Sequence, residues 1–149
     1  MAGPFFSTQL TNVNNVVVNQ PGQLGGDGFI IPFNYTTPSS GAPAVGEFVY
    51  LNNIPEGFYV SGIFVNSEAL SSGAGTAGAD LGDDDSGQRY GAAFNFDAAV
   101  NQFLAIAPTA AAGFLFRNDK LRLLRATVTG EAWATSKKFF GFVLGFRDA

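Results

Sequence analysis

The segment Phe139–Arg147 alternates strictly between two kinds of residue. A period of two is that of a β-strand, whose successive side chains point to opposite faces. One stripe is large and apolar and the other is rich in glycine, so we expect one densely packed face and another that a second backbone can approach closely. The large stripe is Phe140, Phe142, Leu144 and Phe146, and the other is Gly141, Val143 and Gly145.

Two further segments have clear strand patterns. Phe58–Asn66 is apolar on both faces, which predicts a strand in the interior of a sheet. One of its predicted faces holds Tyr59, Ser61, Ile63 and Val65, and the other holds Phe58, Val60, Gly62 and Phe64. Lys120–Thr129 places Leu121 and Leu123 on one face, with Leu124, Ala126 and Val128 on the other.

Shorter strands are predicted at Glu47–Leu51, Thr76–Leu81 and Tyr90–Phe96, with a turn at Pro55-Glu56-Gly57 before the long apolar segment. The segment Asp97–Ala107 fits a helix or a strand equally well, because its apolar residues do not define a period.

Composition supports an all-β fold. The 149 residues include 16 Phe, 19 Gly and 7 Pro, so aromatic strand formers are cut into short segments by turn residues. Roughly eight short strands at intervals of about ten residues predict a single antiparallel β-sandwich that is jelly-roll-like, with almost no helix.

The first 45 residues differ from the rest, since Asn, Gln, Thr, Gly, Pro and Ser dominate them. We expect residues 1–45 to form an extended N-terminal arm with short strands, followed by a β-sandwich domain at 46–149. Pro32, Pro38 and Pro43 exclude helix there and disfavour central strands. A pair of edge strands on the same sandwich is the alternative.

The surface predicted from the composition suits contact with other proteins. Charged residues make up only 13% of the chain, and a neutral polar surface is easily desolvated on docking. The net charge of −4 and the dispersed Lys and Arg disfavour nucleic-acid binding. We expect no secretory signal at the N-terminus and no membrane span, because the most apolar long stretch, 98–116, is interrupted by polar residues and Pro108.

The chain lacks the residues that most catalytic sites need. It has no His and no Cys, which excludes Ser-His and Cys-His nucleophiles and zinc sites built on these residues. A glycosidase-like pair of carboxylates is formally open among Glu47, Glu56, Glu68, Glu131 and the Asp run, but no spacing supports it. We therefore assign no catalytic, cofactor-binding or metal-binding residues and expect no enzyme activity.

The sharpest local feature is the acidic segment Asp80–Asp85, in which Asp80, Asp83, Asp84 and Asp85 lie among glycines. Such oxygen ligands could hold Ca²⁺, although the spacing is not that of an EF-hand. We favour a solvated turn in which Asp side chains accept hydrogen bonds from backbone N–H groups.

Arg89, Tyr90 and Trp133 each allow two interpretations. Arg89 and Tyr90 could contact a neighbouring subunit, but an ion pair within the chain is the preferred interpretation of Arg89. Trp133, the only Trp, could stack on a sugar if exposed, and core packing is preferred. The loop Ser71–Gly75 is predicted to be flexible.

The span from about Ile54 to Arg147 resembles the small β-sandwich structural proteins of tailed phages. The resemblance is one of pattern and covers about two thirds of the chain. It rests on Pro55-Glu56-Gly57-Phe58-Tyr59-Val60-Ser61-Gly62, on Leu81-Gly82-Asp83-Asp84-Asp85 with Arg89-Tyr90, and on Leu121-Arg122-Leu123-Leu124 before Thr127-Val128-Thr129-Gly130.

The resemblance implies a virion subunit, assembled in the host cytoplasm, of the capsid decoration or cement type. Its partners would be the major capsid protein and further copies of itself in a homo-oligomer, for which a trimer is our expectation. Two alternatives stay open: a carbohydrate- or receptor-binding sandwich that uses Trp133 or exposed Tyr residues, and a tail-tube or connector subunit.

Overall fold

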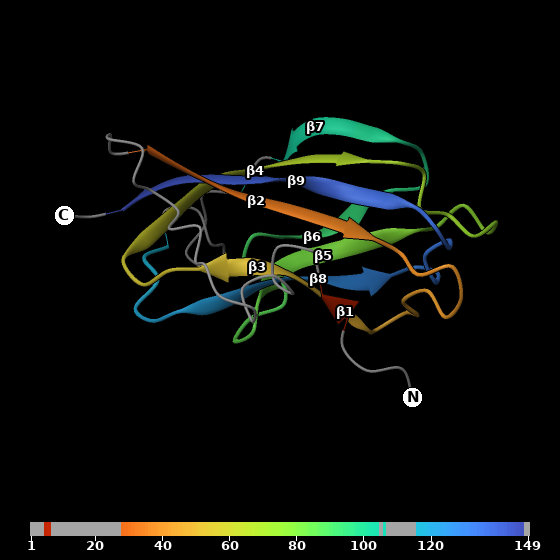
Figure 1. Cartoon of the computed structure of the whole chain (residues 1–149), viewed down its shortest axis with the longest axis horizontal. Helices are drawn as coiled ribbons and strands as arrows, with labels where there is room; N and C mark the ends of the chain where they lie inside the picture. Colours follow the sequence, from red (N-terminus) through yellow and green to blue (C-terminus); the bar gives the residue numbers. More distant parts are fainter. Residues whose placement is uncertain (1–4, 7–27, 105, 107–115, 148–149) are drawn as a thin grey trace.

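The computed structural model of the chain describes residues 5–6, 28–104, 106 and 116–147. Two β-sheets lie face to face and enclose the core (Figure 1). One sheet has the strand order β1-β3-β8-β5-β6 and the other β2-β9-β4-β7. The strands are β1 (Phe5–Phe6), β2 (Gly28–Thr36), β3 (Phe48–Ile54), β4 (Phe58–Ser67), β5 (Gly78–Asp83), β6 (Gly91–Asn95), β7 (Val100–Leu104), β8 (Arg122–Thr129) and β9 (Lys138–Arg147).

From β2 onward, successive strands alternate between the two sheets except for the hairpin of β5 and β6. All pairs among these eight strands are antiparallel, whereas the two-residue β1 pairs with β3 in parallel. The predicted antiparallel β-sandwich is therefore confirmed, whereas its jelly-roll-like character stays a prediction. The described part of the chain contains no helix, as expected.

Strand β4 is an interior strand, as its two apolar faces predicted, and it lies between β9 and β7. Its predicted faces are only half correct, because a β-bulge shifts the register between Val60 and Gly62. The extra residue reverses the alternation. Phe58 and Val60 point into the core before the bulge, and Ile63 and Val65 do so after it.

The large stripe of β9 was expected to form the densely packed face, and this expectation is wrong. The glycine-rich stripe faces the core, together with Phe139, and the stripe of large side chains lies on the outer face, where Phe140 and Phe146 are exposed. Rings from neighbouring strands fill the space that the glycines leave. An added Cβ would lie 3.0 Å from the Phe33 ring at Gly141 and 2.6 Å from the Phe58 ring at Gly145.

The predicted close approach to these glycines is present, but it comes from the adjacent strand. An added Cβ would lie 1.9 Å from the Phe64 carbonyl oxygen at Gly141 and 2.0 Å from the Tyr59 carbonyl oxygen at Gly145. Both oxygens belong to β4. Glycine at these positions is thus required for the pairing of β9 with β4.

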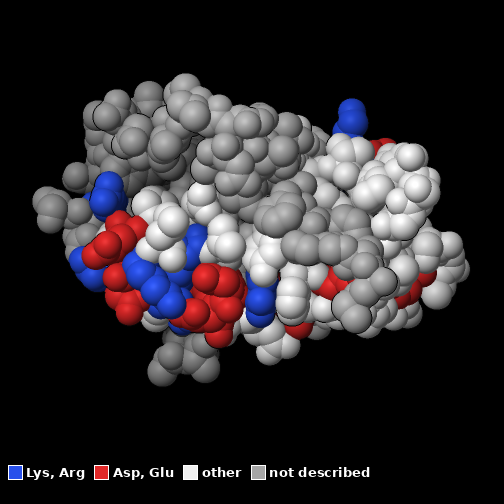
Figure 2. Space-filling view, turned by 60° about the horizontal axis from the view of Figure 1, so that its bottom comes forward, with Lys and Arg blue, Asp and Glu red and all other residues white. Residues whose placement is uncertain are grey.

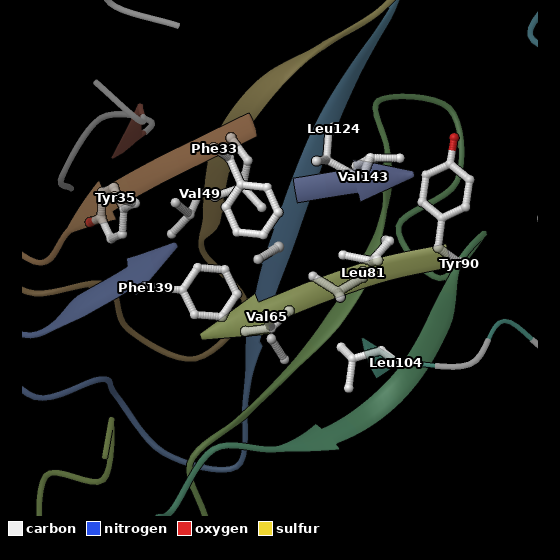
Figure 3. Close-up of a cluster of buried hydrophobic side chains, with 14 of the residues drawn as sticks. Phe33, Tyr35, Val49, Val65, Leu81, Tyr90, Leu104, Leu124, Phe139 and Val143 are labelled. Carbon is white, nitrogen blue, oxygen red and sulfur yellow. The ribbon is translucent and has the colours of Figure 1, made fainter. Parts of the chain in front are cut away.

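Aromatic rings from both ends of the chain meet in the core (Figure 3). Phe139 of β9 lies 5.6 Å from Phe33, 5.3 Å from Phe96 and 5.3 Å from Trp133, measured between ring centroids. The facing sheet contributes smaller side chains. Leu124, Ala126 and Val128 of β8 share a face as predicted, and that face is the buried one, whereas Leu121 is exposed.

Part of the first 45 residues belongs to the sandwich. Strand β2 pairs with β9 over nine residues, from Gly28 opposite Phe146 to Thr36 opposite Lys138, and it forms an edge of its sheet. Edge placement accommodates Pro32, which has no N–H to donate. The rest of the proposed arm falls largely on residues 7–27, outside the described residues, so the division at residue 45 stays a prediction.

The undecided segment Asp97–Ala107 contains a strand, β7, which pairs with β4 from Val100 to Leu104. The strand forms the other edge of the four-stranded sheet.

Candidate functional site

The outer face of the four-stranded sheet carries most of the exposed large apolar side chains in the described part of the chain. The strand register places them in rows across the sheet. One row runs Pro32, Phe142, Phe64 and Phe103, and the next runs Ile30, Leu144 and Gly62. We define the aromatic face as Ile30, Tyr59, Phe64, Phe103, Phe142, Leu144 and Phe146.

Ring pairs make the aromatic face continuous. Phe64 and Phe142 stack with centroids 5.1 Å apart, and Tyr59 and Phe146 stack at 4.9 Å. The Phe103 ring lies over Gly62, where an added Cβ would come within 1.9 Å of it. Ile30 is 52% exposed, Phe103 49% and Phe146 37%. A contiguous apolar surface of this kind is typical of protein contact sites.

The outer face of the five-stranded sheet differs. Its central positions include Arg125 and Thr127 on β8 and Asp80 on β5. The exposed ring of Phe48 on this face is covered by Arg125, whose guanidinium carbon lies 4.1 Å from the ring centroid. The two faces of the sandwich are thus chemically distinct, and the apolar one is the stronger candidate for a docking surface.

A second feature is a charged corner where β5 ends and β8 begins, and Figure 2 shows acidic and basic side chains interleaved there. Asp83 is fully buried and accepts hydrogen bonds from the backbone N–H groups of Asp85 at 3.0 Å and Ser86 at 2.9 Å. Its other oxygen accepts a hydrogen bond from Nε of Arg89. Arg89 and Asp83 therefore form the predicted ion pair within the chain.

The corner continues into the start of β8 through Arg122, which is 4% exposed. Its guanidinium donates to Asp85 and, at 2.6 Å, to Asp119. Hydrogen bonds from Lys120 and Arg122 lower the pKa of Asp85, and Arg122 lowers that of Asp119. The charges of the corner are largely matched by their neighbours.

The acidic segment is the end of β5 and the turn that follows it, and its side chains accept backbone hydrogen bonds as we favoured. The expected solvation is wrong for Asp83, which is buried. Asp84 accepts a hydrogen bond from the N–H of Leu123 at 2.9 Å. Asp80 accepts one from the N–H of Ala93 at 2.7 Å and one from the Gln88 amide at 2.8 Å. Among the described residues, no group of three or more acidic side chains is arranged to hold a metal ion.

Tyr90 and Trp133 lie in the core. Burial raises the pKa of Tyr90, whose exposed fraction is 1%. Trp133 is equally buried, and its Nε1 donates to the carbonyl oxygen of Gly78 at 3.1 Å. The core interpretation of Trp133 is confirmed, so this ring is not a platform for a ligand.

Glu131 was not singled out from the sequence beyond the list of carboxylates. Its two oxygens accept hydrogen bonds from the Ser71 and Ser72 hydroxyls and from the Ala74 and Thr76 N–H groups, at 2.6 to 3.0 Å. These bonds, led by that from Ser71, lower the pKa of Glu131 to about 2. The loop that was predicted to be flexible is therefore fixed at four points by one carboxylate.

No protein-family model matches the chain, and no curated protein matches it in sequence. Two solved structures match it in three dimensions. A chain from the capsid of Ralstonia phage GP4 aligns with a TM-score of 0.72 and 16% identity over 99% of each chain. A chain of the cyanophage Pam1 capsid asymmetric unit aligns with a TM-score of 0.65 and 20% identity over 91% of this chain and 96% of that one.

The fold is shared with phage capsid chains. The resemblance to phage β-sandwich structural proteins, drawn from the sequence for about two thirds of the chain, is confirmed at the level of fold and extends over nearly its whole length. The described part of the chain has no helix that is long and apolar enough to cross a membrane.

Proposed function

We propose that the chain is a non-enzymatic structural subunit of a tailed-phage virion that decorates the capsid and stabilises the head. One observation carries the proposal: the fold matches a chain of a phage capsid along 99% of both chains. Because the match leaves almost nothing of either chain outside the alignment, it concerns a whole subunit and not a common substructure. A second capsid supports the same inference.

The aromatic face is the surface by which this subunit would dock on the major capsid protein. Phe103 and Phe146 project large apolar area into solvent, and burial of such area against the shell favours association. No acidic or basic side chain belongs to the aromatic face, so its desolvation costs little. Several copies in a homo-oligomer would bridge neighbouring capsid subunits.

Stabilisation would follow from mass action. A subunit that binds the assembled shell and not the loosened one stabilises the shell by its binding free energy. Heads that lack the chain should therefore open at a lower temperature than heads to which the purified chain has been added back. Equal opening temperatures, measured by release of packaged DNA, would count against a cement role.

Two pairs of variants test the docking surface. Phe103→Ser and Phe146→Ser each remove an exposed ring from the aromatic face and should weaken binding to heads by at least about tenfold. Leu121→Ser and Val45→Ser are matched controls, because these side chains are exposed but lie outside the aromatic face. If all four variants bind like the parent chain, the docking surface lies elsewhere.

A further inference from the structure

The outer face of the four-stranded sheet carries amide side chains in the row next to the aromatic face. The register places Asn34 of β2 and Asn66 of β4 on either side of Phe140, with Asn101 of β7 next to Asn66. An aromatic ring that is 38% exposed thus lies in a row with three amide side chains. We call these four residues the amide row.

The surface beside the amide row is hollowed. A hollow of about 330 Å³ is lined by Phe33, Asn34, Thr36, Lys138 and Phe140. Asn34 is directly opposite Phe140 and Thr36 is directly opposite Lys138, so the outer positions of two paired strands form its floor. The volume is at the lower end of the range for small-molecule sites.

The polar side chains of the hollow and the row have unused hydrogen-bonding capacity. Those of Asn34, Thr36, Asn66 and Asn101 make no hydrogen bond with the described part of the chain. Each amide offers two donor hydrogens and a carbonyl acceptor. Such groups can pair with adjacent hydroxyls that both donate and accept, while the exposed ring of Phe140 offers an apolar surface to C–H groups.

From this arrangement we infer that the amide row and its hollow bind a neutral pyranose of a surface glycan. A pyranose has one apolar C–H face and a rim of hydroxyls, which complement the Phe140 ring and the amides beside it. Among the described residues that line the hollow, Lys138 is the one with a charge, and its amine can donate to a hydroxyl. The inference concerns the free chain, because the amide row adjoins the aromatic face on the same side of the sheet and docking on a shell would compete with sugar binding there.

The amide row also replaces the sugar platform considered from the sequence. Trp133 is buried, so the carbohydrate interpretation that relied on it fails at that residue. Phe140 meets the requirement that Trp133 does not, because its ring is exposed and flanked by amides that make no hydrogen bond within the described part of the chain. Since the hollow is open and shallow, we expect a single site to bind weakly, with dissociation constants on the order of millimolar.

Nuclear magnetic resonance of the full-length chain tests this inference. The probes are free glucose, galactose, mannose and N-acetylglucosamine, each titrated into labelled protein up to tens of millimolar. At least one sugar should shift the side-chain amide signals of Asn34 and Asn66 in a saturable manner. If none of the four sugars shifts these signals, the inference is overturned.

Variants locate the binding. Phe140→Ala and Asn34→Ala should each abolish the saturable shifts of the remaining amides, and the Asn34 variant serves if removal of the ring prevents folding. Phe103→Ala is the matched control, because its ring is exposed on the same face but does not line the hollow. If Phe103→Ala lost sugar binding while Phe140→Ala and Asn34→Ala kept it, the site would be contradicted. Binding of the Asn34→Ala variant to phage heads, measured in parallel, tests the proposed capsid role separately from sugar binding.

Discussion

Glu131 shows how one carboxylate can order a loop of small residues. Backbone N–H groups and serine hydroxyls of residues 71–76 converge on its two oxygens. The loop contains few apolar side chains that could anchor it by packing. Its conformation therefore depends on the charge of Glu131.

The pKa of Glu131 predicts a specific loss of stability in acid. A carboxyl group whose pKa is lowered on folding contributes stability above its ordinary value of 4.5, and that contribution is lost as the pH falls toward about 2. Glu131→Gln should lower the free energy of unfolding at neutral pH and flatten its fall across this window. Urea unfolding over the same pH range measures both effects.

The control for Glu131 is Glu56→Gln, because Glu56 is exposed and makes no side-chain hydrogen bond with the described residues. Glu56→Gln should leave the fall of the unfolding free energy in acid unchanged. If Glu131→Gln also left it unchanged, the hydrogen bonds of Glu131 would not be coupled to folding.

Two glycines with similar backbone angles separate conformational strain from steric conflict. Gly130 has φ +76°, and an added Cβ would lie 1.7 Å from the Thr76 carbonyl oxygen. Gly41 has φ +69° with nothing within 4 Å. Gly41→Ala should cost about 1 kcal/mol for the left-handed conformation alone, and Gly130→Ala about 3 kcal/mol or more. Denaturant unfolding measures both, and equal losses would refute the steric argument.

At the scale of the elements, the charged corner joins the turn after β5 to the start of β8. Asp83 accepts from the backbone of its own turn and pairs with Arg89. Arg122 joins the two segments through Asp85 and also pairs with Asp119 in its own segment. The Phe116 ring lies 4.0 Å from the guanidinium carbon of Arg89. The corner is therefore a cross-link between two segments distant in sequence.

Removing the buried charge of this corner should be costly. Asp83→Asn keeps an acceptor for the turn but leaves Arg89 and Arg122 without their buried counter-charge. We expect a loss of about 3 kcal/mol in the free energy of unfolding. Asp84→Asn is the control, because Asp84 is exposed and forms no ion pair with the described residues, and its loss should be clearly smaller. Similar losses in calorimetry would argue that the buried ion pair is unimportant.

Strand patterns predicted the elements well and their faces less well. The alternation in β8 correctly grouped Leu124, Ala126 and Val128 on one face, because that strand has no irregularity in its described pairing with β5. In β4 the bulge after Val60 reversed the expected sides. A bulge depends on pairing with another strand, so a single sequence does not indicate where it lies.

The orientation of β9 failed for a different reason. Size alone predicted a densely packed face for the phenylalanine stripe and close approach of a backbone for the glycine stripe. In the folded chain, Phe33 and Phe58 supply the volume above Gly141 and Gly145, so the smaller stripe is the one that fits inside. The aromatic face and the amide row also depend on the pairing of strands that are distant in sequence, so they could not be predicted from the sequence alone.

At the scale of the whole molecule, the two outer faces of the sandwich differ in chemistry. The five-stranded sheet presents polar and charged residues, and the four-stranded sheet presents the aromatic face at one end and the amide row at the other. A subunit with one apolar side can bind a shell in one orientation. The low content of charged residues predicted an assembling protein, but only the strand register identifies the apolar face on which the docking proposal rests.

Binding of the purified chain to phage heads that lack it tests the central claim most directly. The amount of bound chain should saturate at a fixed ratio to the major capsid protein, with the chain in a small oligomer of defined mass by light scattering. Phe146→Ser should fail to reach that ratio under the same conditions, while Leu121→Ser should reach it. A chain that stays unbound at every concentration would contradict the capsid role and leave only the fold in common with the two phage capsids.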